Sequence, residues 1–367
     1  MSFSDMIGRS KEELDTPALL LDLNVAEGNI RRMADTILRQ AGVQWRPHTK
    51  GMKTPALAHK LLAAGAHGVT CAKLGEAEVM ASAGIRDILV ANQVVTPHKI
   101  ERLVNLRHHA DVKVAVDNPE NVAAIDRAAL KKGIVQRVLI EVDTGMERAG
   151  VLPGAPVLEL ARQIDACEGV EFAGIMTWES MVLKITDLEE RQQAITAALK
   201  SFSDSAQLCR EAGLPVEIVS CGGTGTYWMS AFAEGITEIQ AGGGIYCDRV
   251  YRGRFGVDHP YALTIRASVT SRPNETRIIC DAGKKTMTND HGVPEPLGLP
   301  PVKELTLSAE HGRIELEAAS QTPKVGDALE FIVGYSDTTV VLHDQIYGIR
   351  DGVVETVWPL WGRGRLQ

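Results

Sequence analysis

The sequence predicts an α/β protein in which a TIM barrel is followed by a C-terminal all-β domain. Short β-rich runs alternate with Ala-, Leu- and Glu-rich helical stretches from residue 17 to about residue 245, which is typical of a parallel sheet with helical crossovers. Unusual residues follow one run after another, and a barrel gathers such strand ends at one face. After about Tyr251 the helical stretches stop. We therefore expect domains at residues 1–250 and 251–367.

Nine β-rich runs support the barrel, and several are apolar throughout, as in a sheet covered on both faces. A barrel uses eight strands, so one run lies outside it or the count is one too high. A doubly wound open sheet is the competing fold, and it would leave some of the unusual strand ends far apart. The runs are Ala18–Leu23, Val43–Lys50, Gly68–Lys73, Asp87–Gln93, Val112–Asp117, Arg137–Asp143, Val170–Trp178, Val216–Cys221 and Thr237–Gly242.

Helices are expected between these runs. Pro119 and Glu120 suit a first helical turn and Gly133 suits a helix end, which predicts a helix over Pro119–Lys132. Others are expected at Val25–Arg39, Gly75–Ala83 and Leu188–Ala212. In the second domain, alternating apolar and polar residues joined by short turns predict strands. These are Leu263–Ser271, Arg277–Ala282, Leu305–Ser308, Arg313–Glu317, Ala328–Val333 and Thr339–Asp344.

The composition excludes several classes of protein. The chain has 367 residues, of which 44% are hydrophobic, and its 39 Lys and Arg against 47 Asp and Glu give a net charge of −8. This balance argues against a nucleic-acid partner, whose phosphates need a surplus of cations. No stretch of about 18 residues stays apolar, so we expect no membrane span, and the N-terminus does not resemble a secretory signal. The six scattered cysteines then predict a reduced, cytoplasmic protein.

The segment Arg46-Pro47-His48-Thr49-Lys50 ends the second expected strand. A Lys at this end of a barrel strand points into the mouth, where the sites of such folds lie. Partial desolvation there lowers the pKa of the amine, which can then attack a carbonyl to form a Schiff base. A solvated Lys near a loop is the alternative, and this segment alone leaves both interpretations open.

Two glycine-rich segments follow the last strands of the expected barrel. In Ser220-Cys221-Gly222-Gly223-Thr224-Gly225-Thr226, consecutive backbone N–H groups and hydroxyls are able to face one oxyanion, as in a phosphate site. This segment has neither the Lys-Ser/Thr of a Walker A loop nor the acidic residue that binds ribose in dinucleotide folds. Gln240-Ala241-Gly242-Gly243-Gly244 ends the next strand, and adjacent loops late in a barrel commonly share one phosphate. Two turn-forming glycine clusters are the alternative.

Arg148 and Trp178 also come directly after expected strands. Arg148 is able to donate to an oxygen or ring substituent of a cofactor, or it is a surface Arg in a loop. Trp178 either lies against a flat ring or belongs to the core. An amine early in the barrel, a phosphate site late in it and no nucleotide motif together indicate pyridoxal 5′-phosphate (PLP) as the cofactor.

The chain resembles the D-threonine aldolase / D-serine dehydratase family, which are PLP enzymes of the alanine-racemase fold (fold type III). The resemblance runs in order over nearly the whole chain. It implies a PLP-binding barrel with the earliest strand outside it, a small amino acid as substrate, and a homodimer whose sites are completed across the interface. It rests on Thr16-Pro17-Ala18-Leu19-Leu20-Leu21-Asp22-Leu23, Arg46-Pro47-His48-Thr49-Lys50, Glu141-Val142-Asp143-Thr144-Gly145, Gly222-Gly223-Thr224-Gly225-Thr226 and Asp281-Ala282-Gly283-Lys284-Lys285.

The same resemblance assigns roles to single residues. It makes Lys50 the Schiff-base lysine, puts His48 beside the cofactor and gives Arg148 a contact with the ring side of the cofactor. Trp178, Ser220 and Tyr246 are further expected cofactor-binding residues. The phosphate is expected on Gly222, Gly223, Thr224, Gly242 and Gly243.

Two family histidines are missing from this chain. Metal-dependent members carry a His-x-Asp or His-x-Cys pair in the β domain, and here Asp337 matches while Tyr335 stands at the His position. Met52 replaces a second family His, just after Lys50. A lone Asp holds a divalent ion weakly, because such sites gain affinity from added charged oxygens. Asp337 is therefore a doubtful metal ligand.

Tyr335 has three interpretations: packing, an unusual neighbour of a metal, or an acid/base group whose pKa is lowered by a nearby Schiff-base cation. His343 and Asp344 are neighbours in an expected strand, so their side chains should point to opposite faces and not bind one ion.

The function expected from these residues and this resemblance is that of a PLP-dependent lyase. It would cleave D-configured β-hydroxy-amino acids by a retro-aldol reaction to glycine and an aldehyde. A dehydratase of the D-serine or 3-hydroxyaspartate type is one alternative. Another is a metal-independent amino-acid racemase that uses Lys50 and Tyr335 as bases on opposite faces. A PLP carrier without robust catalysis is the non-enzyme alternative, and the added β domain counts against it.

Overall fold

The computed structural model describes residues 3–367, which form two compact units. The barrel unit comprises Arg32–Lys50, Pro55–Gly242 and Gly364–Gln367. The β unit comprises the described residues up to Arg31, together with Gly51–Thr54 and Gly243–Arg363. The sequence-based division at residue 250 stays a prediction.

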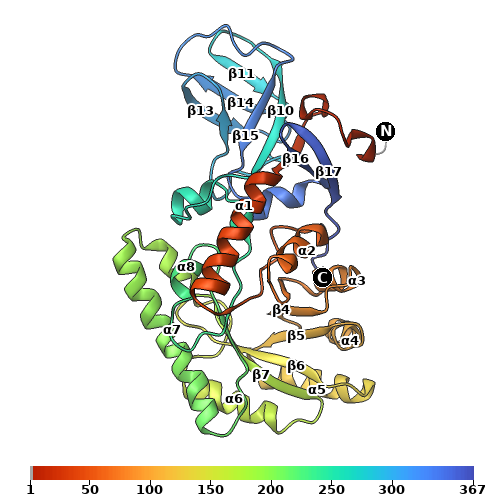
Figure 1. Cartoon of the computed structure of the whole chain (residues 1–367), viewed down its shortest axis with the longest axis vertical. Helices are drawn as coiled ribbons and strands as arrows, with labels where there is room; N and C mark the ends of the chain where they lie inside the picture. The colour runs from red at the N-terminus through yellow and green to blue at the C-terminus, as the bar shows by residue number, and fades with distance from the viewer. Residues whose placement is uncertain (1–2) are drawn as a thin grey trace. The chain divides into compact units, whose positions relative to one another are not determined.

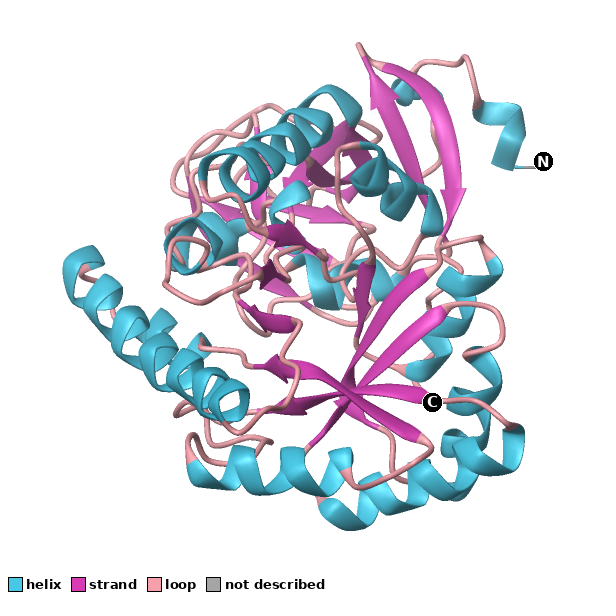
Figure 2. Cartoon of the chain, turned by 60° about the horizontal axis from the view of Figure 1, so that its bottom comes forward, coloured by secondary structure: helices cyan, strands magenta, loops and turns pink. Residues whose placement is uncertain are grey.

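The barrel unit contains eight parallel strands in the order β2-β9-β8-β7-β6-β5-β4-β3, which confirms the expected fold class. Helices lie along the outside of this curled sheet (Figure 2). The strands are β2 (Gln44–Trp45), β3 (Val69–Cys71), β4 (Asp87–Gln93), β5 (Asp111–Val116), β6 (Gln136–Glu141), β7 (Val170–Met176), β8 (Ile218–Cys221) and β9 (Glu238–Ile239). The α-helices are α2 (Pro55–Ala63), α3 (Leu74–Ser82), α4 (Pro97–Leu106), α5 (Pro119–Lys132), α6 (Ala155–Asp165), α7 (Leu188–Glu211) and α8 (Tyr227–Ser230). Two other helical segments are the π-helix η3 (Asp35–Gln40) and the 3₁₀ helix η4 (Ser180–Lys184).

The two edge strands of this sheet meet just before Lys50. A single parallel bridge joins His48 to Thr70 of β3. The N–H of Thr70 donates to the carbonyl of Pro47 at 2.9 Å, and the N–H of Thr49 donates to the carbonyl of Thr70 at 2.7 Å. The segment predicted as a strand over Val43–Lys50 is regular only at Gln44–Trp45, because Pro47 has no N–H to continue a ladder.

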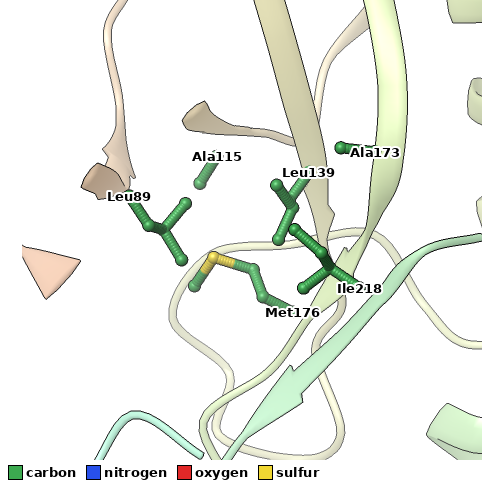
Figure 3. Close-up of a cluster of buried hydrophobic side chains, with 6 residues drawn as sticks. All are labelled: Leu89, Ala115, Leu139, Ala173, Met176 and Ile218. Carbon is green, nitrogen blue, oxygen red and sulfur yellow. The ribbon is translucent and has the colours of Figure 1, made fainter. Parts of the chain in front are cut away.

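The interior of the barrel is apolar at mid-height. The side chains of one buried cluster point toward one another from five consecutive strands (Figure 3). On β6, alternation puts Arg137 and Glu141 on the same face as Leu139 of this cluster. Charged residues therefore lie toward the start of the strand and a carboxylate toward its end, where barrel sites are found. The cluster comprises Leu89, Ala115, Leu139, Ala173, Met176 and Ile218.

The β unit is built on a nine-stranded, mostly antiparallel sheet whose main path is β13-β14-β11-β10-β1-β16-β17. Strand β1 (Ala18–Asp22) pairs with β10 (Leu263–Ser271) and β16 (Gln345–Arg350), so it lies outside the barrel and accounts for the ninth predicted run. Figure 1 labels most of these strands. The others are β11 (Arg277–Cys280), β12 (Glu295–Leu297), β13 (Val302–Leu307), β14 (Gly312–Leu316), β15 (Ala328–Ile332) and β17 (Val353–Pro359).

Helical elements of the first and last parts of the chain are mostly short. The long one is α1 (Leu23–Ala34), which begins in the β unit. The short ones are η1 (Phe3–Met6), η2 (Lys11–Glu13), η5 (Gly243–Ile245), η6 (Val250–Arg254), α9 (Ser336–Thr339) and η7 (Val340–Leu342). In the part of the chain that the structure describes, no helix is long and apolar enough to cross a membrane.

The prediction of a strand over Thr339–Asp344 is wrong. The chain there forms α9 and η7, and a strand begins only at Gln345. The buried carboxylate of Asp248 accepts hydrogen bonds from both the N–H and the hydroxyl of Ser336, at 2.7 Å each, and so holds the first turn of α9. His343 and Asp344 still face different partners, the carbonyl of Thr286 and the guanidinium of Arg363.

Candidate active site

Lys50 is half-buried and follows directly on the closure of the barrel. The N–H of Lys50 donates to Nδ1 of His48 at 3.3 Å, and the N–H of His48 donates to the carbonyl of Gln240 at 2.9 Å. The His48 ring is thus tied to the backbone of the candidate nucleophile. The structure brings the ends of β2 and β9 together here, as the sequence analysis expected of a barrel.

Gly242 packs against the same segment. A Cβ at this position would overlap the carbonyl oxygen of His48, so only glycine fits. The indole N–H of Trp45 donates to the carbonyl of Ala241 at 2.8 Å and fixes the neighbouring residue. The phosphate contact predicted for Gly242 stays a prediction, and close packing is one established reason for this glycine.

The glycine-rich loop after β8 is organised by Glu179, whose side chain is fully buried. Its carboxylate accepts hydrogen bonds from the N–H of Gly222 at 3.2 Å, the hydroxyl of Thr226 at 2.7 Å and the hydroxyl of Ser230 at 2.6 Å. The N–H of Gly223 donates to the Thr226 hydroxyl at 3.2 Å. Phosphate contacts from the N–H groups of Gly222 and Gly223 would therefore replace hydrogen bonds to Glu179 and Thr226.

The side chain of Trp178, which follows β7, packs against this loop. A Cβ at Gly223 would overlap the six-membered ring of Trp178, so the absence of a side chain at position 223 makes room for the indole. Trp178 is half-buried and Thr224 is buried. The structure thus brings together Trp178, Gly223 and their neighbours, and their contacts with a cofactor remain predictions.

Ser220 faces the interior of the barrel. Its hydroxyl donates to Oε1 of Glu238 at 2.7 Å and accepts from Nε2 of Gln240 at 3.0 Å. Burial alone raises the pKa of Glu238, but the Arg46 guanidinium and hydrogen bonds from His67 and Ser220 outweigh it and hold the pKa at about 2. The predicted cofactor contact of Ser220 stays a prediction, because its hydroxyl already serves this network.

Arg148 is held at one side of the strand ends by a carboxylate. Its Nη2 lies 3.3 Å from Oε1 of the buried Glu141, and Oε2 of Glu141 accepts from Nε2 of Gln93 at 2.6 Å. Gln93 also lies 3.2 Å from Asp117. Arg148 itself is 53% exposed, so its guanidinium is anchored on one side and open on the other, as a ligand-binding Arg requires.

Four predicted site residues belong to the β unit. Tyr246 is fully buried, and its hydroxyl makes no hydrogen bond to any residue that the structure describes. Burial raises the pKa of Tyr246, and the charge of Asp337 raises it further. A Cβ at Gly243 would lie 2.6 Å from the hydroxyl of Tyr251. A buried hydroxyl without an acceptor, such as that of Tyr246, lowers the stability of the fold unless a ligand oxygen accepts its hydrogen bond.

Tyr335 and Asp337 lie together at the start of α9. The hydroxyl of Tyr335 donates to Oδ2 of Asp337 at 3.1 Å. Its ring centroid lies 5.8 Å from that of Tyr251 and 5.1 Å from that of His291. Burial raises the pKa of Tyr335, and the Asp337 carboxylate adds to this effect. These surroundings oppose the lowering of the Tyr335 pKa that the sequence analysis considered.

The residues present fit PLP and do not fit a divalent cation. Lys50 offers an amine at a barrel strand end, and Tyr246 offers an unsatisfied buried hydroxyl that suits a phosphate or ring oxygen. By contrast, among residues 3–367 no three His, Cys, Asp or Glu side chains gather as a metal site. Asp337 instead accepts a hydrogen bond from the hydroxyl of Tyr335, which leaves a donor set unlike that of a divalent cation site.

Several residues that organise the site escaped the sequence analysis. Glu179, Glu141 and Glu238 are buried carboxylates that hold the glycine loop, Arg148 and Arg46 respectively. In the sequence each of them is an acidic residue inside or directly after an apolar strand, where an unpaired charge would be costly.

Comparisons with known proteins cover nearly the whole chain. Residues 21–250 match the family described as alanine racemase, N-terminal domain, and residues 262–349 match the putative serine dehydratase domain. A D-threonine aldolase of Arthrobacter sp is 38% identical over 96% of this chain and 93% of its own. A 3-hydroxy-D-aspartate aldolase of Paracoccus denitrificans is 35% identical over 98% and 94%.

Solved structures agree with these matches. The D-threonine aldolase of Filomicrobium marinum superposes with a TM-score of 0.94 at 33% identity and covers 98% of this chain and 99% of that one. A variant of D-threo-3-hydroxyaspartate dehydratase in the metal-free form gives a TM-score of 0.85 at 28% identity and covers 95% and 98%.

Proposed function

The chain belongs to the D-threonine aldolase / D-serine dehydratase family of the alanine-racemase fold, and from this premise we propose that it is a PLP-dependent lyase. Its substrates are D-configured β-hydroxy-amino acids, and its reaction is retro-aldol cleavage to glycine and an aldehyde. The observation that carries this proposal is the position of Lys50, directly after the closure of the barrel, in a chain that matches an aldolase over nearly its full length.

PLP, when bound, accepts the electron pair that is released when a bond to Cα breaks. Lys50 binds the cofactor through its amine, and the backbone contact with His48 limits the freedom of this segment. Arg148, anchored by Glu141, donates to the ring side of the cofactor. The buried hydroxyl of Tyr246 donates a hydrogen bond to an oxygen of the cofactor. Gly222, Gly223, Thr224, Gly242 and Gly243 are the proposed phosphate contacts, with Trp178 and Ser220 beside them.

The retro-aldol reaction requires that the β-hydroxyl of the substrate lose its proton as the Cα–Cβ bond breaks. We assign this step to Tyr335. Its hydroxyl already donates to Asp337 at 3.1 Å, so it is able to take the substrate proton while it passes its own to the carboxylate. This hydrogen bond supports the assignment.

Two measurements on the purified protein test the proposal. D-threonine should release acetaldehyde and glycine, whereas L-threonine should not. Lys50→Ala should abolish both this activity and the visible absorbance of bound PLP, and Lys200→Ala, at an exposed site on α7, should change neither. Retention of the absorbance by Lys50→Ala would contradict the role of Lys50.

The same assay separates the alternatives. Keto acid plus ammonia would mark a dehydratase, the activity in the name of one structural relative. Exchange of the α-hydrogen with inversion would mark a racemase that uses Lys50 and Tyr335. A cytoplasmic homodimer with shared active sites is also part of the proposal, and the six free cysteines, five of them buried, support a reducing compartment.

A further inference from the structure

The surroundings of Asp337 in the β unit differ from a divalent cation site. Oδ2 of Asp337 accepts a hydrogen bond from the Tyr335 hydroxyl at 3.1 Å. Oδ1 lies against the backbone of Gly51, where a Cβ would come within 2.5 Å. Oδ2 therefore carries the hydrogen bond from Tyr335, while Oδ1 is buried near Gly51 and makes no hydrogen bond that the structure describes.

A second buried phenol extends this arrangement. The hydroxyl of Tyr251 hydrogen-bonds that of Tyr335. Tyr335 has a single hydroxyl proton, which goes to Asp337, so Tyr251 is the donor in its bond to Tyr335. The result is a hydroxyl chain, defined as Tyr251 donating to Tyr335 and Tyr335 donating to Asp337.

Other polar groups near the hydroxyl chain have partners of their own. The carboxylate of Asp248 accepts from the N–H of Tyr251 at 2.8 Å and from Ser336 twice at 2.7 Å. The hydroxyls of Thr288 and Thr338 pair with each other at 2.7 Å. His291 is exposed and packs edge-on against the Tyr335 ring. A cation bound at Oδ2 of Asp337 would have to displace the hydrogen bond from Tyr335.

Neutral phenols are poor substitutes for the missing ligands. Tyr251 and Tyr335 each use their hydroxyl proton in a hydrogen bond of the hydroxyl chain, so each offers only a hydroxyl oxygen. Divalent cations gain affinity from carboxylate and carbonyl oxygens and from imidazole nitrogen. The strongest potential ligand here is a single carboxylate that already accepts a hydrogen bond.

We propose that the hydroxyl chain replaces a metal centre in this protein, which therefore neither binds a divalent cation at Asp337 nor needs one for its reaction. The part of this inference that concerns activity rests on the proposed function, and the part that concerns binding stands without it.

A Mn²⁺ titration of the holoenzyme, with free Mn²⁺ followed by its paramagnetic resonance signal, tests the binding part. The unmodified chain should show no saturable uptake below roughly 1 mM. Tyr335→His should take up about one Mn²⁺ per chain, because imidazole and carboxylate together suit this ion, and adding Asp337→Asn should remove that uptake. Saturable uptake by the unmodified chain that Asp337→Asn abolishes would overturn the proposal, as would a folded Tyr335→His that takes up none.

Chelation tests the activity part. Aldehyde release should stay within about twofold after treatment with EDTA, whereas a tenfold loss that Mn²⁺ restores would overturn the proposal. If no D-β-hydroxy-amino acid is cleaved with or without Mn²⁺, the proposed function fails, and the Mn²⁺ titration still decides whether a cation binds. Should Tyr335→His not fold, the titration of the unmodified chain decides by itself.

Discussion

Glu179 offers a direct test of how the glycine-rich loop is held. Its buried carboxylate accepts from Gly222, Thr226 and Ser230. The hydroxyls of Thr226 and Ser230 both donate to Oε1, and the N–H of Gly222 donates to Oε2. Glu179→Gln keeps the size and one carbonyl oxygen, which the two hydroxyls retain. The amide nitrogen of the new side chain then faces the N–H of Gly222. Both groups are hydrogen-bond donors, so the bond from Gly222 is lost.

The expected cost follows from this count. A hydrogen bond to a charged group contributes about 1.5–3 kcal/mol, and a buried donor left without an acceptor costs about as much. Glu179→Gln should therefore lower the free energy of unfolding by roughly 2–3 kcal/mol. If about 1.4 kcal/mol of this is strain within the loop, the Kd for PLP should rise about tenfold.

Urea unfolding followed by circular dichroism measures the first effect, and the visible absorbance of bound PLP measures the second. Ser230→Ala removes one of three donors to the carboxylate and should cost about 1.5–3 kcal/mol. Glu190→Gln, an exposed position on α7, should stay within about 0.5 kcal/mol. If Glu179→Gln matches Glu190→Gln in both assays, the carboxylate does not organise the loop.

Three further predictions concern packing, positioning and pH. Gly242→Ala should lower the melting temperature sharply, because its Cβ would overlap the His48 carbonyl. Gly253→Ala is the control and should leave the melting temperature unchanged, because a Cβ there meets nothing within 4 Å. Equal melting temperatures of the two variants would refute the close packing. Glu141→Gln should weaken the hold on Arg148 and raise the Kd for PLP by about tenfold, at roughly 1.4 kcal/mol for one charge-assisted bond; an unchanged Kd would contradict this anchoring. The pKa of Glu238 lies at about 2 in the folded protein, against an ordinary value of 4.5, so this carboxylate stabilises the fold above pH 4.5 by about 3 kcal/mol and loses that contribution as the pH falls toward 2. In urea unfolding across this pH range, the free energy of unfolding should fall less steeply for Glu238→Gln than for the unmodified chain. Parallel falls in the two proteins would refute the assignment.

The sequence analysis predicted correctly those elements whose ends are fixed by neighbouring residues in the sequence. Helix α5 begins and ends where the sequence analysis expected, because the side chain of Asn118 caps its first turn and Gly133 ends it at a φ of 66°. The strand predicted over Thr339–Asp344 failed for the opposite reason. Its backbone is held by Asp248, which lies 88 residues earlier than Ser336, and no local pattern carries that information.

The same distinction applies to the site. Lys50 and the glycine-rich segments stand out because such residues are unusual at strand ends. Glu179 and Glu238 do not stand out, because their meaning lies in partners that the fold brings from far away. The bond from Ser230 to Glu179 spans 51 residues and that from Arg46 to Glu238 spans 192, so both carboxylates become visible only in three dimensions.

The glycines of the two segments have causes that the sequence analysis did not separate from phosphate binding. Gly223 makes room for Trp178, Gly242 packs on the His48 backbone and Gly243 lies beside the Tyr251 hydroxyl. Each would be glycine for steric reasons with no phosphate present, so their number is weak support for an oxyanion. The Tyr246 hydroxyl is stronger support, because no steric requirement explains a fully buried donor without an acceptor. Phenylalanine would fill the same space at less cost, which supports the proposal that this hydroxyl meets an oxygen of the cofactor.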